Sequence, residues 1–352
     1  MNALTLSIIL VVIAFLVLVT MAAYTVYAER KVAAAIQQRV GPNRVGPLGL
    51  LQPLADVLKL LLKEDIVPAS ADKLVHFIAP VIAVGISFVT MAVIPFAKAD
   101  LAMTEATGGF LTIANVNIGV LYILAISSVA VYGVTLAGWS SNSKYALLGG
   151  LRSSAQMISY ELAMGLSVVS VILLTNYRFE GADGFLSPGA IVEAQRGAWN
   201  FLVNPIGAII FITCAFAEAN RAPFDLVEAE QELVGGFHTE YSSTKFASFF
   251  LAEYVHVIVA SMLITTFFFG GYLSPIDGFL DVAGWAPAAQ LAWSLGWFML
   301  KTLFFVFVFI WVRWTLPRFK YNQLMDLGWK KFLPLALLNL VVIAGVIAFL
   351  ST

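Results

Sequence analysis

The sequence predicts an all-α protein, a polytopic bundle of helices that span a membrane. Its 352 residues are 60% hydrophobic and only 12% charged, and their mean hydropathy is +0.89. An average soluble domain has about a quarter of its residues charged and about half apolar. Long apolar runs separate the few charged segments. Together these observations predict a chain whose main solvent is lipid.

Eight apolar segments are long enough to cross a bilayer, which requires about 20 apolar residues in a helix. The fifth segment is the shortest, and it contains Asn204 and Pro205 near its start. No connecting segment is large enough to fold separately, so we expect residues 1–352 to form a single membrane domain. The predicted spans cover residues 4–27, 75–96, 117–138, 155–175, 201–217, 246–269, 291–312 and 332–350.

The basic residues predict the orientation of the bundle. Loops on one side hold 16 Lys and Arg residues, whereas loops on the other side hold 3. Because basic residues concentrate in cytoplasmic loops, we expect the basic side to face the cytoplasm or the matrix of an organelle. Both termini are then outside. The basic loops cover residues 28–74, 139–154, 218–245 and 313–331.

A short segment at residues 48–63 is predicted to form an amphipathic helix along the membrane interface. Its polar residues recur at helical spacing and share one stripe, whereas the rest of its surface is apolar. Such a helix is too short to span. It is either a membrane-surface anchor or the lip of a portal for a lipid-soluble substrate. The polar stripe consists of Gln52, Asp56, Lys59 and Lys63.

Composition also excludes several kinds of function. The single cysteine, Cys214, allows no internal disulfide and no thiolate cage for a metal. The three histidines, His76, His238 and His256, contain no pair at the helical spacing of metal ligands. We therefore expect no metal site, haem or iron–sulfur cluster held by this chain alone. The formal net charge of −1 excludes a nucleic-acid-binding surface.

The cytoplasmic segment 218–240 concentrates six carboxylates and one arginine, a formal charge of −5 with His238 neutral. Asp225 and Glu228 fit a capping box at the start of a short helix, which is an ordinary structural explanation for two of the acids. Mutual repulsion and burial raise the pKa of neighbouring carboxyl groups, so the cluster is equally typical of a proton relay. Its charged residues are Glu218, Arg221, Asp225, Glu228, Glu230, Glu232 and Glu240.

Two further acids, Glu161 and Glu253, lie inside predicted spans. A charge at the centre of a lipid-exposed helix costs roughly 2.5–3.5 kcal/mol on insertion scales, so both should face the bundle interior. The structural alternative is a hydrogen bond between helices, from a Tyr or a Ser. Lys301 is a third charge inside a span, and it is either a counter-ion or a side chain that reaches toward the interface.

Three segments of the chain resemble one family of membrane proteins. They are YAERKVAAAIQQRVGPNRVGPLGLLQPLADVLKLLLKE at 27–64, EANRAPFDLVEAEQELVGGFHTEYSSTKFASFFLAEY at 218–254, and RWTLPRFKYNQLMDLGWKKFLPLALLN at 313–339. The segments look like those of the NADH-quinone oxidoreductase membrane protein that anchors the redox arm of respiratory complex I, equivalent to mitochondrial NADH dehydrogenase subunit 1. The resemblance covers nearly the whole chain.

The resemblance implies a subunit without a redox centre that forms the access chamber for a quinone, expected to be ubiquinone. FMN and iron–sulfur clusters would be in partner subunits only. The implied partners are the peripheral subunits of the quinone site and the small membrane subunits beside the antiporter-like subunits. The implied location is the bacterial cytoplasmic membrane, with membrane lipid around the bundle, the acidic loop in the cytoplasm and both termini in the periplasm.

The resemblance also assigns roles to individual residues. The quinone chamber and its loop are expected to involve Arg39, Asp56, Lys59, Arg221, Phe224, Asp225 and Glu228. The proton path that couples quinone reduction to proton translocation is expected to involve Glu161, Glu218, Glu230, Glu232, Glu240 and Glu253. The entrance and subunit junction are expected to involve Glu29, Arg30, Gln37 and Arg44.

Two other hypotheses remain at the level of sequence. A related complex, such as a membrane-bound hydrogenase or a dehydrogenase of the deazaflavin coenzyme F-420, reuses a similar anchor protein. A stand-alone proton or ion transporter is a different class, although the chain has no evident internal repeat of the kind found in many transporters. Co-purifying subunits would distinguish all three.

Overall fold

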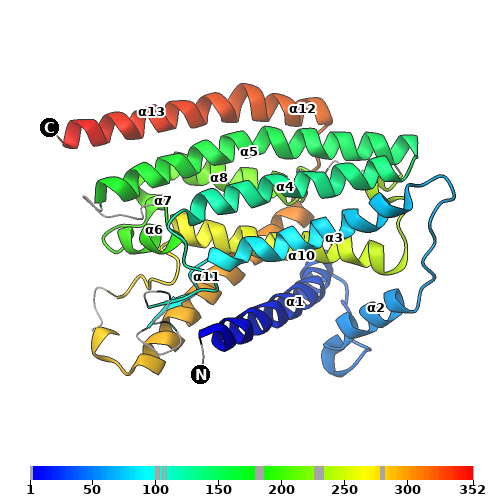
Figure 1. Ribbon diagram of the computed structural model, residues 1–352, viewed down its shortest axis with the longest axis horizontal. Helices are drawn as coiled ribbons and strands as arrows, with labels where there is room; N and C mark the ends of the chain where they lie inside the picture. Colours follow the sequence, from blue (N-terminus) through cyan, green and yellow to red (C-terminus); the bar gives the residue numbers. More distant parts are fainter. Residues whose placement is uncertain are drawn as a thin grey trace.

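The computed structural model describes residues 3–99, 104, 107, 109–178, 186–225, 234–277 and 282–351 (Figure 1). It confirms an all-α bundle. The α-helices are α1 (Ala3–Ile36), α2 (Gln52–Leu61), α3 (Lys73–Val89), α4 (Gly119–Ser140), α5 (Lys144–Arg178), α6 (Pro188–Ala194), α7 (Asn200–Val203), α8 (Pro205–Glu218), α10 (Ser243–Phe268), α11 (Pro287–Thr315), α12 (Tyr321–Asp326) and α13 (Leu333–Leu350).

Shorter elements connect these helices. A two-stranded antiparallel hairpin joins β1 (Ala97–Lys98) to β2 (Phe110–Leu111), with Ala97 opposite Leu111. Single turns of 3₁₀-helix form η1 (Pro47–Gly49), η2 (Thr90–Val93), η4 (Gly236–His238) and η5 (Val282–Gly284). A π-helical turn, η6 (Leu327–Phe332), links α12 to α13.

Seven helices of the described chain are long and apolar enough to cross a membrane, and they correspond to seven of the eight predicted spans. The remaining predicted span, 201–217, is the pair α7 and α8. α8 has 14 residues, about 21 Å at 1.5 Å per residue, whereas the bilayer core is about 30 Å thick. The break falls at Asn204, whose side chain accepts a hydrogen bond from the Gly207 backbone at 2.9 Å and caps α8. Pro205, which lacks an N–H, begins that helix.

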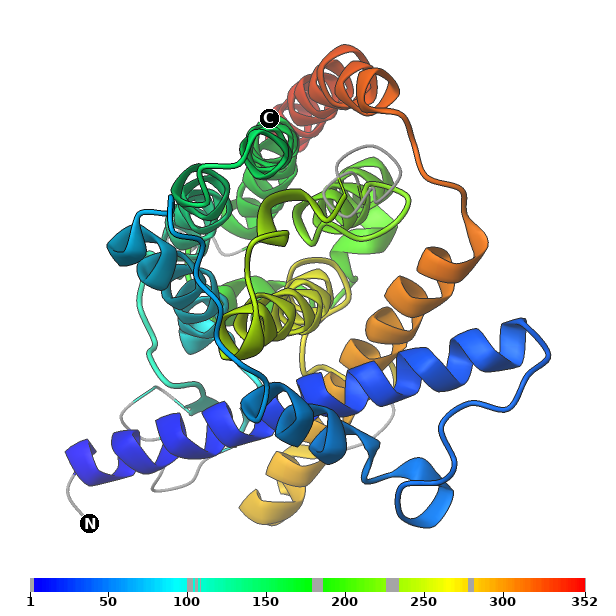
Figure 2. The ribbon, with the colours of Figure 1, turned by 90° about the vertical axis from the view of Figure 1, so that its right-hand side faces the viewer.

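The long helices lie side by side in one layered bundle. α13, α5, α4, α3 and α10 follow one another across the molecule, and each packs on the next (Figure 1). Figure 2 looks nearly along α5, α10 and α13, whereas α1 and α11 cross that view obliquely. Both termini lie toward one end of the bundle, which we call the termini end, and α2 lies toward the opposite end, the α2 end.

Close approach of the helices depends on small residues at their crossings. A Cβ atom on Gly138 of α4 would lie 2.6 Å from the Ala146 carbonyl oxygen and 3.2 Å from the Cα atom of Gly150 in α5. No side chain fits there. Large side chains fill the interior beyond this crossing, and Tyr160, Phe211 and Phe267 are almost fully buried. Among the described residues, the bundle therefore has a packed core.

The amphipathic helix begins later than predicted, at Gln52, because residues 47–49 form η1. The first half of its polar stripe faces α1, where Asp56 accepts hydrogen bonds from Arg30 at 2.6 Å and from Gln52 at 3.0 Å. The two lysines of the stripe, Lys59 and Lys63, are exposed. Its apolar residues remain exposed: Leu54, Val57, Leu58 and Leu61. This exposed face suits a membrane interface, and that location remains a prediction.

Charged residues are also held together at the termini end. The Glu193 carboxylate in α6 accepts hydrogen bonds from Arg196 at 2.5 Å, Tyr272 at 2.5 Å and Lys98 at 3.2 Å. In α11 the Lys301 ammonium donates to the carbonyls of Phe269, Gly271 and Leu273 at 2.7, 2.9 and 2.5 Å. These carbonyls follow the carboxyl end of α10, where a cation is favoured. Lys301 therefore joins α11 to the segment after α10. The sequence analysis expected either a counter-ion or a side chain that reaches toward the interface, and did not describe this arrangement.

Candidate functional site

A buried arginine, Arg221, lies where the loop after α8 meets α1 and α10. Its guanidinium contacts the Glu253 carboxylate at 2.9 Å and the Glu29 carboxylate at 3.5 Å. The same group lies over the Tyr254 ring, 4.3 Å from its centroid, and the Tyr254 hydroxyl donates to Glu29 at 2.9 Å. Arg221 is only 3% exposed. One cation thus joins acids from two helices.

The electrostatics keep Arg221 charged. Burial lowers the pKa of its guanidinium, but the neighbouring Glu253 carboxylate, Tyr254 and Glu29 raise it more, so the net pKa lies above its usual range. A buried charge is tolerated only when it is paired and hydrogen-bonded. The Nη2 atom of Arg221 is nevertheless buried without a hydrogen-bond partner.

Two more arginines of this region come from the segment after the middle of α11. The first extends the cluster around Arg221 through Glu29, and the second forms an ion pair of its own. Arg313 contacts Glu29 at 2.7 Å, and Arg318 contacts Asp225 at 3.0 Å. Asp225 is 1% exposed, so its charge needs such a partner. We call Arg221, Glu29, Glu253, Arg313, Asp225 and Arg318 the arginine–carboxylate network.

The sequence analysis counted Arg313 and Arg318 only as orienting charges. The charge balance could have indicated a role for these two arginines. The buried acids of the loop and of α1 need cations as partners, and those cations must come from other segments of the fold. The third matching segment contained both residues, but spacing along a chain does not show which helix end meets which loop.

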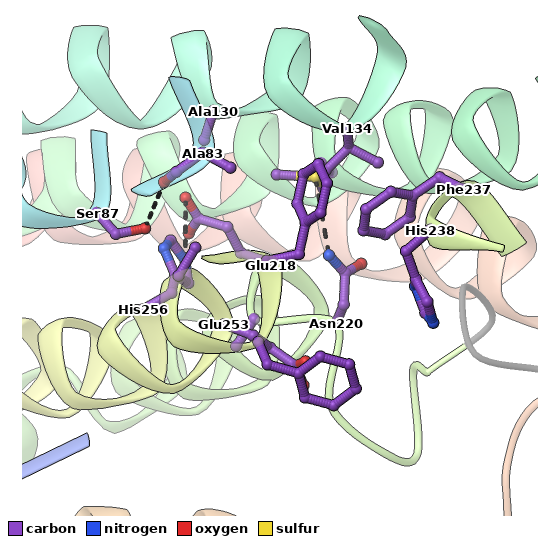
Figure 3. A pocket seen from close by; sticks show the side chains of 15 residues that line it. Ala83, Ser87, Ala130, Val134, Glu218, Asn220, Phe237, His238, Glu253 and His256 are labelled. Atoms are coloured by element: carbon purple, nitrogen blue, oxygen red, sulfur yellow. Dashed lines mark hydrogen bonds and ion pairs between the residues drawn. The ribbon is translucent and has the colours of Figure 1, made fainter. Parts of the chain in front are cut away.

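A cavity of about 80 Å³ lies beside the network, among α3, α4, α5, α8, α10 and η4 (Figure 3). This volume is enough for several water molecules, because about 10–15 Å³ of such cavity space holds one. Most of the wall is apolar, as at Phe237 and Phe249. Its polar lining residues are Ser87, Glu218, Asn220, His238, Glu253 and His256. Glu253 therefore belongs both to the network and to the cavity wall.

Inside the cavity, Glu218 at the end of α8 and His256 of α10 point toward each other (Figure 3). The Glu218 Oε1 atom lies 3.8 Å from the His256 Nε2 atom. His238 lies at the opposite side of the cavity, and burial lowers the pKa of its imidazole to about 4. Its ring is therefore neutral at neutral pH. Sequence analysis gave neither histidine a role beyond the metal-ligand count.

Glu161 lies in α5 and accepts a hydrogen bond from the Ser128 hydroxyl of α4. This contact is the interhelical hydrogen bond that the sequence analysis set out as the structural alternative. The negative charge of Glu161 also acts on Glu218. Glu161 is thus both satisfied locally and electrostatically coupled to the cavity.

Several other predicted site residues lie outside this arrangement. Phe224 is 3% exposed and packs edge-on against Tyr160 with ring centroids 5.4 Å apart, so it belongs to the core. The Arg39 guanidinium donates to Gln37 at 2.6 Å on the surface. Arg44, Lys59 and Glu240 make no contact with the arginine–carboxylate network among the interactions of the described residues. Glu228, Glu230 and Glu232 lie outside the described residues.

Fold and site together define a class: a multi-pass helical membrane protein that gathers arginines and carboxylates between its helices. Within the described part of the chain, no group of His, Cys and carboxylate side chains is arranged to hold a metal ion.

Comparison with known proteins identifies the family. A family model for NADH dehydrogenase matches residues 8–344. The chain is 56% identical over 352 residues to NADH-quinone oxidoreductase subunit 8 of Rhodothermus marinus, covering 96% of this chain and 97% of the relative. It is 55% identical over 348 residues to an NADH-quinone oxidoreductase subunit of Salinibacter ruber, covering 96% and 95%. An NADH-quinone oxidoreductase subunit of Leptospira biflexa is 52% identical over 328 residues, covering 91% and 88%. The chain belongs to the NADH dehydrogenase family.

Proposed function

We propose that the chain is a membrane subunit of an NADH-quinone oxidoreductase, that it forms part of the quinone path, and that it begins the proton path coupled to quinone reduction. The observation that carries this proposal is the position of Glu253, which pairs with Arg221 on one side and lines the cavity on the other. The names of the curated relatives favour this complex over a hydrogenase anchor or a stand-alone transporter.

An apolar cavity supports the quinone part of the proposal. Its volume is about 340 Å³, and α1 and α11 form its walls, with Tyr24, Ala28 and Ile310 among the lining residues. Ala28 immediately precedes Glu29, and Ile310 lies one turn before Arg313. A quinone has an apolar tail and a polar head group, so an apolar cavity that ends beside fixed charges suits both parts.

The arginine–carboxylate network supports the coupling part. Reduction of a quinone takes up protons and changes the charge near its head group. Charges in a dry interior interact more strongly than charges in water, so such a change acts on paired carboxylates nearby. Glu29 and Glu253 share one guanidinium, and Glu253 faces the water-sized cavity. The network therefore links a quinone on one side to a proton-accepting carboxylate on the other.

Glu253→Gln in the assembled complex tests this proposal. Gln keeps the size of the side chain but carries no negative charge and no transferable carboxyl proton. We expect the rate of proton translocation by the complex to fall by tenfold or more. Proteoliposomes with a pH-sensitive dye measure it, alongside quinone reductase turnover.

The matched control is Asp326→Asn, which removes an exposed carboxylate that pairs with Lys330 at 2.7 Å. Exposed ion pairs contribute little, so both activities should stay near those of the unmodified complex. Unchanged reductase turnover and unchanged proton translocation in the Glu253→Gln complex would refute the proposed role of the network.

A further inference from the structure

A second, smaller cavity lies deeper among α4, α5, α8 and α10. Its volume is about 20 Å³, which is enough for one water molecule. Ser127, Met164 and Phe211 are among its lining residues. The first cavity has different walls, and only two residues line both: Glu218 and His256. This carboxyl–imidazole pair therefore separates the two cavities.

The geometry of the pair is unusual for ordinary packing. The side chains of His256 and Glu218 are 17% and 10% exposed, and the separation of 3.8 Å is too long for a direct hydrogen bond. The His256 Nε2 atom is buried and has no hydrogen-bond partner. A buried nitrogen without a partner costs about 1–3 kcal/mol. His76 bears the same kind of cost, so what distinguishes His256 is its place beside Glu218 between the two cavities. A small movement of either side chain, or one bridging water, would complete the contact.

Imidazole is suited to a position between two cavities. It has two nitrogen atoms on opposite sides of the ring, and one can accept a proton while the other releases one. Ser127 and Ser87 on the neighbouring α4 and α3 can donate or accept hydrogen bonds but carry no titratable charge at neutral pH. The titratable groups that line the first cavity together with the ring are Glu218 from α8, Glu253 from α10 and His238 from η4, and Glu161 from α5 acts on Glu218.

We infer that His256 transfers protons between the two cavities, with Glu218 as its partner. This inference rests on the proposed function and extends it. A proton on the Glu218 carboxyl moves to the Nε2 atom of His256, which leaves a carboxylate and an imidazolium. The imidazolium then releases its Nδ1 proton to water in the second cavity, which leaves the neutral ring protonated at Nε2. Rotation of the ring restores the starting arrangement, and Glu218 can then accept the next proton from the first cavity.

His256→Gln in the assembled complex tests the inference. The amide of Gln can still form hydrogen bonds, but it cannot take up a proton near neutral pH. We expect the rate of proton translocation by the complex to fall by tenfold or more. The pH dependence of translocation should also lose the inflection contributed by the pair, an effect that lost packing alone would not produce.

The matched control is His76→Gln. His76 is a buried histidine of α3 that stacks on Tyr241 at 3.9 Å, has both ring nitrogens without hydrogen-bond partners, and lines neither cavity. The amount of assembled complex is measured for both variants. With equal assembly, His76→Gln should retain proton translocation and its pH profile.

A second variant keeps the inference testable if His256→Gln does not assemble. Ser127→Val leaves the histidine in place but makes this side of the small cavity apolar, so a water there loses a partner. We expect the same loss of translocation. Normal translocation in an assembled His256→Gln complex, or in Ser127→Val where only that variant assembles, overturns the inference. If Glu253→Gln still blocks translocation in that case, the proposed function stands and only the role of His256 is wrong.

Discussion

The arginine–carboxylate network makes a strong prediction about Arg221→Leu. At an effective dielectric constant of about 20, a pair of unit charges attracts by about 6 kcal/mol at 2.9 Å and about 5 kcal/mol at 3.5 Å. These are the separations of Arg221 from Glu253 and Glu29. Desolvation of the ions offsets most of this attraction, but removal of one partner leaves the others buried and uncompensated. The expected net loss of stability is about 3–5 kcal/mol.

The double variant Arg221→Leu/Glu253→Gln separates this effect from lost packing. With the guanidinium gone, neutralising Glu253 removes one uncompensated charge. The double variant should therefore be less destabilised than the sum of the single variants, with a coupling energy of about 0.5–3 kcal/mol. Lys330→Met serves as the control, because this lysine is 73% exposed and pairs with Asp326 on the surface. It should behave like the unmodified protein.

The assay is the amount of assembled complex in isolated membranes and the midpoint temperature of its heat inactivation. Arg221→Leu should reduce both, Lys330→Met neither, and the double variant should recover part of the loss. Normal assembly and an unchanged midpoint for Arg221→Leu would refute the reasoning, because the carboxylates would then be solvated or protonated rather than held by the guanidinium.

Two further predictions concern the termini end. Burial raises the pKa of Glu193, but hydrogen bonds from Arg196 and Tyr272 and the charge of Lys98 lower it more, so its net pKa is lowered. The stabilisation is therefore complete above the ordinary carboxyl pKa of 4.5 and is lost as the pH falls through the lower native value. With Glu193→Gln, the midpoint temperature of heat inactivation should fall less as the pH is lowered below 4.5. The same pH dependence as in the unmodified protein would contradict this prediction. Lys301→Met leaves three carbonyls without their donor and should cost about 1–3 kcal/mol, measured as a lower midpoint; an equal midpoint would show that water replaces the ammonium.

Much of the fold followed from hydropathy alone, because a bilayer imposes a minimum apolar length on every span. The departures have local causes. α5 begins at Lys144 rather than near 155, since its first turns carry polar residues such as Arg152, and hydropathy detects only the apolar part of a helix. α8 is short because Asn204 and Pro205 start it late, and the sequence had already identified that segment as the least regular.

Less of the candidate site than of the fold could be predicted from the sequence. The acids could be found one by one, because charges in an apolar chain are rare. Their partners could not, since the contact of Arg318 with Asp225 joins residues 93 positions apart and depends on how the chain returns after α11. His256 lies inside the predicted span 246–269, but its sequence neighbourhood does not show which group it faces. Only the packing of α8 against α10 shows that its ring faces Glu218 between two cavities.

The way Arg221 divides its contacts suggests how a charge change could be passed on. The guanidinium lies closer to Glu253 than to Glu29, and Glu29 has a second cation, Arg313, at 2.7 Å. A new negative charge near Glu29 would compete for Arg221 and weaken its hold on Glu253. A carboxylate that loses its cation in a dry site binds a proton more readily. Because Glu253 lines the first cavity, that proton would be taken from the water-sized space that Glu218 and His256 also face. In the proposed coupling, the charge acts first on Glu29, then on Arg221 and then on the cavity, in the order in which these groups contact one another.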